Sequence, residues 1–352
     1  MRMWFRPVKG IAFCIVAAFF GSQAMAQVQV KRSFPSAKRI SAFDNTTFCT
    51  AFLSDGSLLT IRDIPIVDLR DVDKVAFNPT GSSLALMRGK KPVSIYSFRD
   101  RNKKLFELKE QRKSKELKGR KNLNFFVPGP VGAELMKDAS KGDIVPVAMC
   151  YGADARNFLV SNSLGEIIVY DTKAYLPQAY IQGKAVATAI TMSPNNYFIA
   201  AGTGKNIDIW NFQTKELRTS LPMPAEVTEL VFSADASQMA VVTADKRLTI
   251  FDTKTWDKVD IFDKIGGTLT SPSFHPDVKF ISVFKDGNAI VIMNLKNSVP
   301  EQTLDENPGG VTGSRFFVNK QTSDVFMLSN RAKGLVFWDA NGLNPFFGKL
   351  MS

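Results

Sequence analysis

Histidine and cysteine, two residue types that often carry out chemistry, are rare in this chain. His275 is the only histidine, and its segment 273–277 (SFHPD) is typical of a turn between strands. With one histidine, the sequence predicts neither a histidine-rich metal cluster nor a Ser-His-Asp triad. Residues 202–205 (GTGK) lack the spacing of a phosphate-binding loop and are interpreted as a hairpin turn. We therefore expect no catalytic residue, no metal and no cofactor.

Carboxylates and cysteines give no stronger signal. Asp55, Asp245 and Asp286 stand in turn-like segments, where Asp is favoured because its side chain hydrogen-bonds to nearby backbone. Cys49 and Cys150 lie in apolar, strand-like runs of different repeats, so we predict buried thiols rather than a disulfide. An alternative stays open: a hydrolase or lactonase whose acids meet around a central axis. Spacing in the sequence does not reveal such convergence.

Positive charge is concentrated in one segment. The chain has a formal net charge of +12, and residues 99–121 hold eleven basic and four acidic residues. The excess therefore belongs to a local feature rather than to the whole surface. This segment is either a solvated basic loop or an electrostatic handle for an acidic protein, phosphorylated headgroups or a polyanionic glycan. In the second interpretation the candidate partner-binding residues are Lys109, Arg112, Lys113, Lys115, Lys118, Arg120 and Lys121.

The first 26 residues have the layout of a secretory signal peptide. Three basic residues precede an apolar run at 11–20, and the small residues Ala24 and Ala26 come just before Gln27. An uncleaved anchor is the weaker interpretation, since spanning a bilayer takes roughly 20 apolar residues. We expect an exported mature chain without a transmembrane segment, periplasmic or associated with a bacterial outer membrane. Export also argues against nucleic acid as the partner.

The sequence repeats at a nearly constant interval. Residues 227–262 contain four short apolar runs separated by polar turns, which predicts four antiparallel strands. The third run of each repeat ends at an anchor residue, usually Asp or Asn after a large residue. Successive anchors are 34, 74, 40, 41, 42 and 45 residues apart, close to the period of ~40–45 of propeller blades in all but one case. The anchors are Asp63, Ser97, Asp171, Asn211, Asp252, Asn294 and Asp339.

At these anchors the chain resembles the WD40-repeat family. The resemblance rests on two kinds of short motif. The strand ends are Trp338-Asp339 and its variants Trp210-Asn211, Tyr170-Asp171 and Phe251-Asp252, and the turns are Ser193-Pro194-Asn195 and His275-Pro276-Asp277. The resemblance covers residues 38–343 and implies an all-β, seven-bladed β-propeller with four antiparallel strands per blade. The chain departs from the family in lacking its Gly-His dipeptide, and one histidine cannot supply the His-Asp-Ser-Trp tetrad. Blade cohesion must then come from apolar packing between sheets.

The ends of the ring and the long interval give more local predictions. A strand at 27–31 (QVQVK) or one at 344–350 (NPFFGKL) closes the last blade; the cleaner alternation favours 27–31. Residues 104–108 form the outer strand of the second blade. The remaining insertion, 109–142, lies between blades 2 and 3 and opens with a short helix that stops at Gly119. Its residues Phe125, Phe126 and Val127 pack onto the ring or contact a partner.

Taken together, these features predict one propeller domain over residues 27–352. A rigid ring whose connectors vary freely suits a protein-interaction scaffold. We expect a non-catalytic scaffold in the cell envelope, with another envelope protein as its partner inside a larger complex.

Overall fold

The structure is a computed structural model of the chain. It describes residues 29–34, 37–42, 49–53, 58–60, 72–80, 82–97, 104–108, 124–126, 144–262, 267–286, 289–304, 313–318, 324–331 and 334–340. Within these ranges the fold is all-β, built from short antiparallel strands, most of them grouped in fours. The predicted all-β class and the four-stranded antiparallel units are confirmed.

The strands form sheets that we name A to G along the chain. Sheet A contains β2 (Ala37–Ala42), β3 (Cys49–Leu53) and β4 (Leu58–Thr60). Sheet B contains β5 (Lys74–Phe77), β6 (Ser83–Met87), β7 (Val93–Ser97) and β8 (Lys104–Leu108). Sheet C contains β10 (Pro146–Tyr151), β11 (Asn157–Asn162), β12 (Glu166–Asp171), β13 (Pro177–Gln182) and the added strand β9 (Asn124–Phe126).

The remaining sheets follow the same plan. Sheet D contains β14 (Ala189–Met192), β15 (Phe198–Gly202), β16 (Asn206–Asn211) and β17 (Leu217–Pro222). Sheet E contains β18 (Val227–Phe232), β19 (Gln238–Thr243), β20 (Leu248–Asp252) and β21 (Lys258–Ile261). Sheet F contains β22 (Leu269–Phe274), β23 (Phe280–Lys285), β24 (Ala289–Asn294) and β25 (Val299–Leu304). Sheet G contains β26 (Gly313–Val318), β27 (Val325–Arg331), β28 (Gly334–Asp339) and β1 (Gln29–Phe34).

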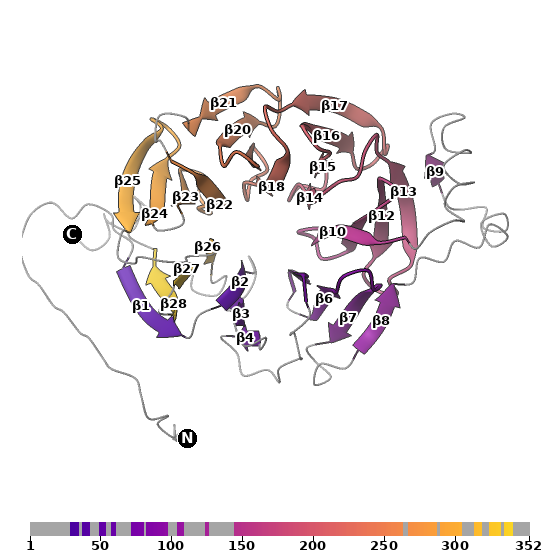
Figure 1. The fold of residues 1–352 in the computed structure, drawn as a ribbon, viewed down its shortest axis with the longest axis horizontal. Coiled ribbons are helices and arrows are strands. Elements are labelled where there is room, and N and C mark those ends of the chain that lie inside the picture. Colours follow the sequence, from indigo (N-terminus) through magenta and orange to yellow (C-terminus); the bar gives the residue numbers. More distant parts are fainter. Residues whose placement is uncertain are drawn as a thin grey trace, which may run out of the picture.

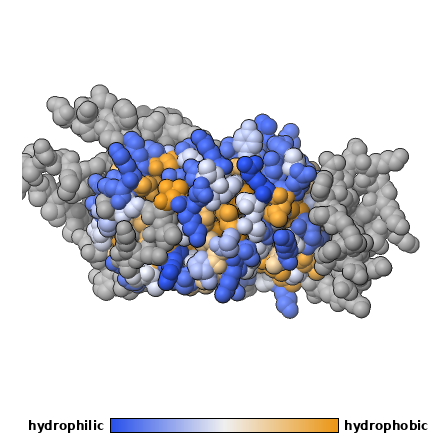
Figure 2. All heavy atoms as spheres, turned by 90° about the horizontal axis from the view of Figure 1, so that it is seen from above, coloured by the Kyte–Doolittle hydropathy of each residue, from blue (hydrophilic) through white to orange (hydrophobic). Residues whose placement is uncertain are grey.

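Figure 1 shows the sheets set around a common centre, with the first strand of each sheet innermost. In sheets B to G, the fourth strand named above lies at the perimeter. The innermost strands contact one another in the succession β5, β10, β14, β18, β22, β26 and β2. Seen from the side in Figure 2, the molecule is wide and low, with apolar patches among hydrophilic residues. The closing of these sheets into a complete seven-bladed ring stays a prediction.

The burial of each strand follows from its position in the sheet. The second and third strands are apolar on both faces because both faces pack on neighbours; β11 is buried along its whole length. The fourth strand β17 is mostly exposed. Between consecutive sheets from B to G lie clusters of buried apolar side chains, such as the one that joins Ile181 of sheet C to Trp210 of sheet D. Apolar packing between sheets therefore holds them together, as expected from the missing tetrad residues.

Both ends of the repeat array are informative. Strand β1 pairs antiparallel with β28 and completes sheet G, which confirms the prediction that the N-terminal strand supplies the outer strand of the last unit. The competing segment 344–350 lies outside the described residues. Strand β8 is the outer strand of sheet B, also as predicted.

The insertion was predicted to lie between blades 2 and 3, with Phe125, Phe126 and Val127 packing onto the ring or contacting a partner. The backbone of Phe125 and Phe126 belongs to β9, which pairs in parallel with the outer strand β13 and so adds a strand to sheet C that was not predicted. The basic segment is thus bounded by two perimeter strands, ending at Leu108 and starting at Asn124. The seven basic residues and the predicted helix lie outside the described residues.

Candidate functional site

The repeated anchor residue closes the turn between the third and fourth strands. Asp171 Oδ1 accepts hydrogen bonds from the backbone N–H groups of Lys173 and Ala174 at 2.9 and 3.0 Å. Asn211 accepts from the backbone of residues 213 and 214, and Asp252 from that of residues 254 and 255. Such a turn needs a short side chain that accepts hydrogen bonds from the backbone two residues ahead. Asp and Asn meet this need, which explains why they recur at the anchor position.

At the four anchors Asp171, Asn211, Asp252 and Asn294, the fourth residue after the anchor, which we call the fourth turn residue, has a left-handed backbone. Its φ is 51° at Tyr175, 64° at Lys215, 64° at Trp256 and 57° at Ser298. In the same place the fourth strand shifts its register against the third, for example between Ile209 and Trp210. The turn therefore presents this side chain in a repeated orientation, whatever its type.

In sheets C and E the fourth turn residue is aromatic and packs on the preceding sheet. Tyr175 is buried, with its ring centroid 5.0 Å from that of Phe106 in sheet B. Its hydroxyl lies 3.1 Å from Ser83 Oγ, also in sheet B. Trp256 is buried, with its ring 5.1 Å from that of Phe198 in sheet D. Each aromatic ring therefore covers the outer part of the junction between two sheets.

Sheet D has a lysine in this position. Lys215 turns back on its own turn: its ammonium donates a hydrogen bond to the carbonyl of Phe212 and lies 3.6 Å from the centroid of the Phe212 ring. Phe212 itself is partly buried against the apolar cluster between sheets C and D. Partial burial disfavours the ammonium and lowers the pKa of Lys215 from 10.5 to about 8.

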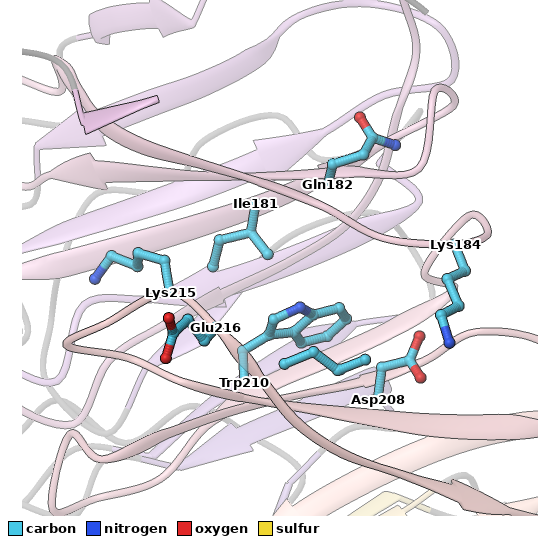
Figure 3. A pocket seen from close by; sticks show the side chains of 8 residues that line it. Ile181, Gln182, Lys184, Asp208, Trp210, Lys215 and Glu216 are labelled. Atoms are coloured by element: carbon cyan, nitrogen blue, oxygen red, sulfur yellow. The ribbon is translucent and has the colours of Figure 1, made fainter. Parts of the chain in front are cut away.

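A pocket of about 330 Å³ lies where this lysine leaves the junction open, and we call it the C–D pocket. Figure 3 shows Ile181 facing the ring of Trp210, with Lys215 and Glu216 toward one end and Lys184 and Asp208 toward the other. Ile181 and Trp210 are 2% and 3% exposed, whereas Leu217 is 40% exposed. The lining residues are Ile181, Gln182, Lys184, Asp208, Trp210, Lys215, Glu216 and Leu217.

One wall of the pocket carries a buried carboxylate. Asp208 is 2% exposed and stands on β16, where the equivalent residue is Ile168 in sheet C and Thr249 in sheet E. Its Oδ1 accepts a hydrogen bond from Ser220 Oγ at 2.6 Å, and its Oδ2 accepts one from Thr203 Oγ1 at 2.9 Å. These hydroxyl donors compensate the loss of water around the buried charge.

Charged residues on the innermost strands tie neighbouring sheets together. Lys74 of β5 donates to the carbonyls of Val147 and Thr188 at 2.8 and 3.3 Å. Arg315 of β26 donates to the carbonyl of Pro272 at 2.8 Å, and burial lowers the pKa of its guanidinium. Among the described residues, no three His, Cys, Asp or Glu side chains gather as metal ligands would. The hydrolase alternative, with acids meeting at the axis, stays an untested prediction.

His275 lies buried in a turn between two strands, as its sequence context predicted. Its ring is fully buried, and its Nδ1 lies 2.6 Å from Asp277 Oδ1. In sheets D and E the equivalent contact is made by Ser193 with Asn195 and by Ser233 with Asp235. Burial acts to raise the pKa of Asp277, but hydrogen bonds and nearby positive charge lower it overall. The histidine thus replaces a serine in a repeated turn.

The cysteines lie in separate sheets, Cys49 on β3 and Cys150 on β10, and Cys150 is a free thiol. Burial raises the pKa of the Cys150 thiol to about 12, against a smaller opposing effect of a backbone hydrogen bond at Met192. The thiolate that reacts with electrophiles and metals is therefore scarce at neutral pH. Cys150 is an apolar packing residue, as its sequence context predicted.

Trp210 could be recognised in the sequence, but its pocket could not. The signal lay in the aligned turns DTKAY, NFQTK, DTKTW and NLKNS, where lysine stands in a place that two neighbours give to an aromatic residue. Asp55 in a predicted turn and the anchor pair Trp338-Asp339 were also noted in the sequence. Asp55 and the side chains of Trp338 and Asp339 lie outside the described part of the structure.

No protein-family model and no curated protein sequence matches the chain. The part of the chain that the structure describes contains no helix long and apolar enough to cross a membrane. The assignment of a function therefore depends on the repeats, the pocket and the charge distribution.

Proposed function

We propose that the chain is an exported, non-catalytic, seven-bladed β-propeller of the WD40-like type that serves as a protein-interaction scaffold in the cell envelope. The observation that carries the proposal is the succession of similar sheets from B to G, each joined to the next through its innermost strand and a shared apolar cluster, with sheet A contacting sheet G through β2. Such a body is stiff, and it can hold its connectors at fixed places while their sequences vary.

The basic insertion is the connector proposed to meet the partner. Residues 109–123 separate the end of β8 from the start of β9, and both strands lie at the perimeter. A dense cluster of lysine and arginine there attracts an acidic surface and speeds its association. The signal-like layout of residues 1–26 supports the placement of this scaffold in the envelope.

The test replaces the seven basic residues from Lys109 to Lys121 with Ser or Gln in the full-length chain. Capture of the protein's envelope partner, measured from native envelope extracts at two salt concentrations, should fall, and its salt dependence should weaken. Unchanged capture with an unchanged salt dependence would overturn the role of this segment. Vesicles containing anionic lipid and a sulfated glycan are tested in parallel, because preferential binding to either would identify a non-protein polyanion as the ligand.

The matched control removes seven exposed lysines elsewhere on the described surface. It keeps the basic insertion and has the same net charge as the test variant, so it separates a local handle from general charge attraction. This control should retain partner capture. The control substitutions are Lys90, Lys173, Lys205, Lys246, Lys254, Lys258 and Lys296, each to Ser.

A further inference from the structure

The C–D pocket is the one junction where a described fourth turn residue is a lysine. At the junction of sheets B and C, the place beside this turn is filled by Tyr175, and at the junction of sheets D and E it is filled by Trp256. The indole nitrogen of Trp256 has no hydrogen-bond partner within the described residues. Trp256 therefore contributes to this junction through the apolar area of its ring rather than through a hydrogen bond.

The pocket has the size and lining that suit one aromatic ring. Its volume of about 330 Å³ is at the small end of the range of roughly 300–1,000 Å³ that is typical of ligand sites. Ile181 and the ring of Trp210 lie at its base and are almost fully buried (Figure 3). Leu217 at its edge is 40% exposed and offers apolar surface to an occupant. Aromatic side chains bury a large area and pair well with a second ring at an offset or at right angles.

The charges at the pocket favour an occupant without strong net charge. Lys184 and Lys215 are balanced by Asp208 and Glu216, one cation and one anion toward each end. Asp208 already accepts hydrogen bonds from Thr203 and Ser220. A neutral aromatic side chain meets this arrangement without leaving a new buried charge unpaired.

We propose that the C–D pocket binds an aromatic side chain supplied by a partner protein, in the place that Tyr175 and Trp256 occupy in neighbouring junctions. The pocket opens at the perimeter beside β17, and the exposed Leu217 at its edge would be covered by the chain that carries the aromatic residue. An aromatic anchor in a pocket with apolar cover around it is the usual centre of a protein–protein contact. This inference rests on the proposed scaffold role and names a contact separate from the basic insertion.

The test uses nuclear magnetic resonance signals of the Ile181 methyl group and the Trp210 indole N–H in the full-length protein. Two probes are titrated: N-acetyltryptophanamide and the blocked peptide Gly-Gly-Trp-Gly-Gly. Both should shift these two signals in a saturable way, with a Kd on the order of 1 mM for a single anchor residue. N-acetylalaninamide should leave the signals unchanged. Absence of saturable shifts with both tryptophan probes would overturn the proposal.

The decisive variant is Lys215→Trp, which supplies the ring from the chain itself, as at Trp256. The backbone tolerates it, because Trp256 adopts the same φ of 64°. Binding of both probes should weaken at least tenfold. The matched control Lys205→Trp adds an indole at an exposed turn and should bind like the original protein. Equal binding by Lys215→Trp and the original chain would contradict the proposal.

Two further outcomes separate this inference from the proposed function. Binding of the amide without binding of the blocked peptide would identify a small-molecule site and overturn a partner side chain as occupant. In partner capture from envelope extracts, Lys215→Trp should reduce recovery while Lys205→Trp does not. If recovery depends on the basic residues but not on position 215, the scaffold role survives and the aromatic contact fails.

Discussion

Two junctions between sheets in this protein share the backbone conformation of one turn residue but have different side chains at that position. Between sheets D and E, Trp256 packs on Phe198 and covers the outer part of the junction. Between sheets C and D, Lys215 occupies the equivalent place, folds back on Phe212 and leaves a pocket. The difference shows that the repeated turn fixes where a side chain starts, while its chemistry decides whether the junction is closed or open.

The largest expected effect comes from opening the closed junction. Trp256→Lys removes a buried indole and introduces a cation, so we expect a loss of about 3–5 kcal/mol in the free energy of unfolding. Urea unfolding followed by circular dichroism measures it. Lys254→Ser, two residues earlier in the same turn and exposed, should change little. A loss below about 1 kcal/mol for Trp256→Lys would mean that the ring contributes little to cohesion.

Closing the open junction should have a smaller effect of opposite sign. Lys215→Trp fills the C–D pocket and removes a partly buried cation, for a gain of about 0.5–2 kcal/mol. The same urea experiment with Lys205→Trp as control checks that the gain requires position 215. A loss of stability would indicate that the pocket cannot accept an indole from this turn.

The anchors provide a test of what the two junctions share. Asn211→Ala and Asp252→Ala each remove an acceptor from two backbone N–H groups, which should lower stability by about 1 kcal/mol in either sheet. Similar losses, measured by thermal unfolding, would confirm that the turn is common to both junctions. A large loss in only one sheet would show that the turns of the two junctions are not equivalent.

The smallest effect concerns pH. Because the pKa of Lys215 is about 8 in the folded chain and near 10.5 when unfolded, the unfolded chain binds more protons between these values. The loss of folding stability caused by burying the charged ammonium is at its maximum below pH 8 and decreases as pH rises toward 10.5. The stability advantage of Lys215→Met over the original chain should therefore shrink across that window. Comparing the two proteins cancels titration elsewhere, and a constant difference would contradict the pKa shift.

The sequence was enough to predict the sheets because their causes are local and repeated. The anchors Asp171, Asn211 and Asp252 close equivalent turns, and the apolar runs between them match buried strands. The N-terminal closing strand was predicted from its alternation alone. These features need only neighbours along the chain or one partner strand.

The pocket and β9 could not be predicted in the same way. Ile181 and Lys215 meet only after two sheets have packed, so their proximity depends on long-range geometry. Strand β9 has three residues and pairs in parallel with β13, and a run that short gives no distinct alternation. The seven basic residues were predicted from charge, and they lie outside the described residues.

A crystal structure of Lys215→Trp tests the central comparison most directly. We expect the introduced indole to lie over Ile181 and Trp210 and to fill the C–D pocket, as Trp256 covers its own junction. An indole directed into solvent, with the pocket still open, would contradict it.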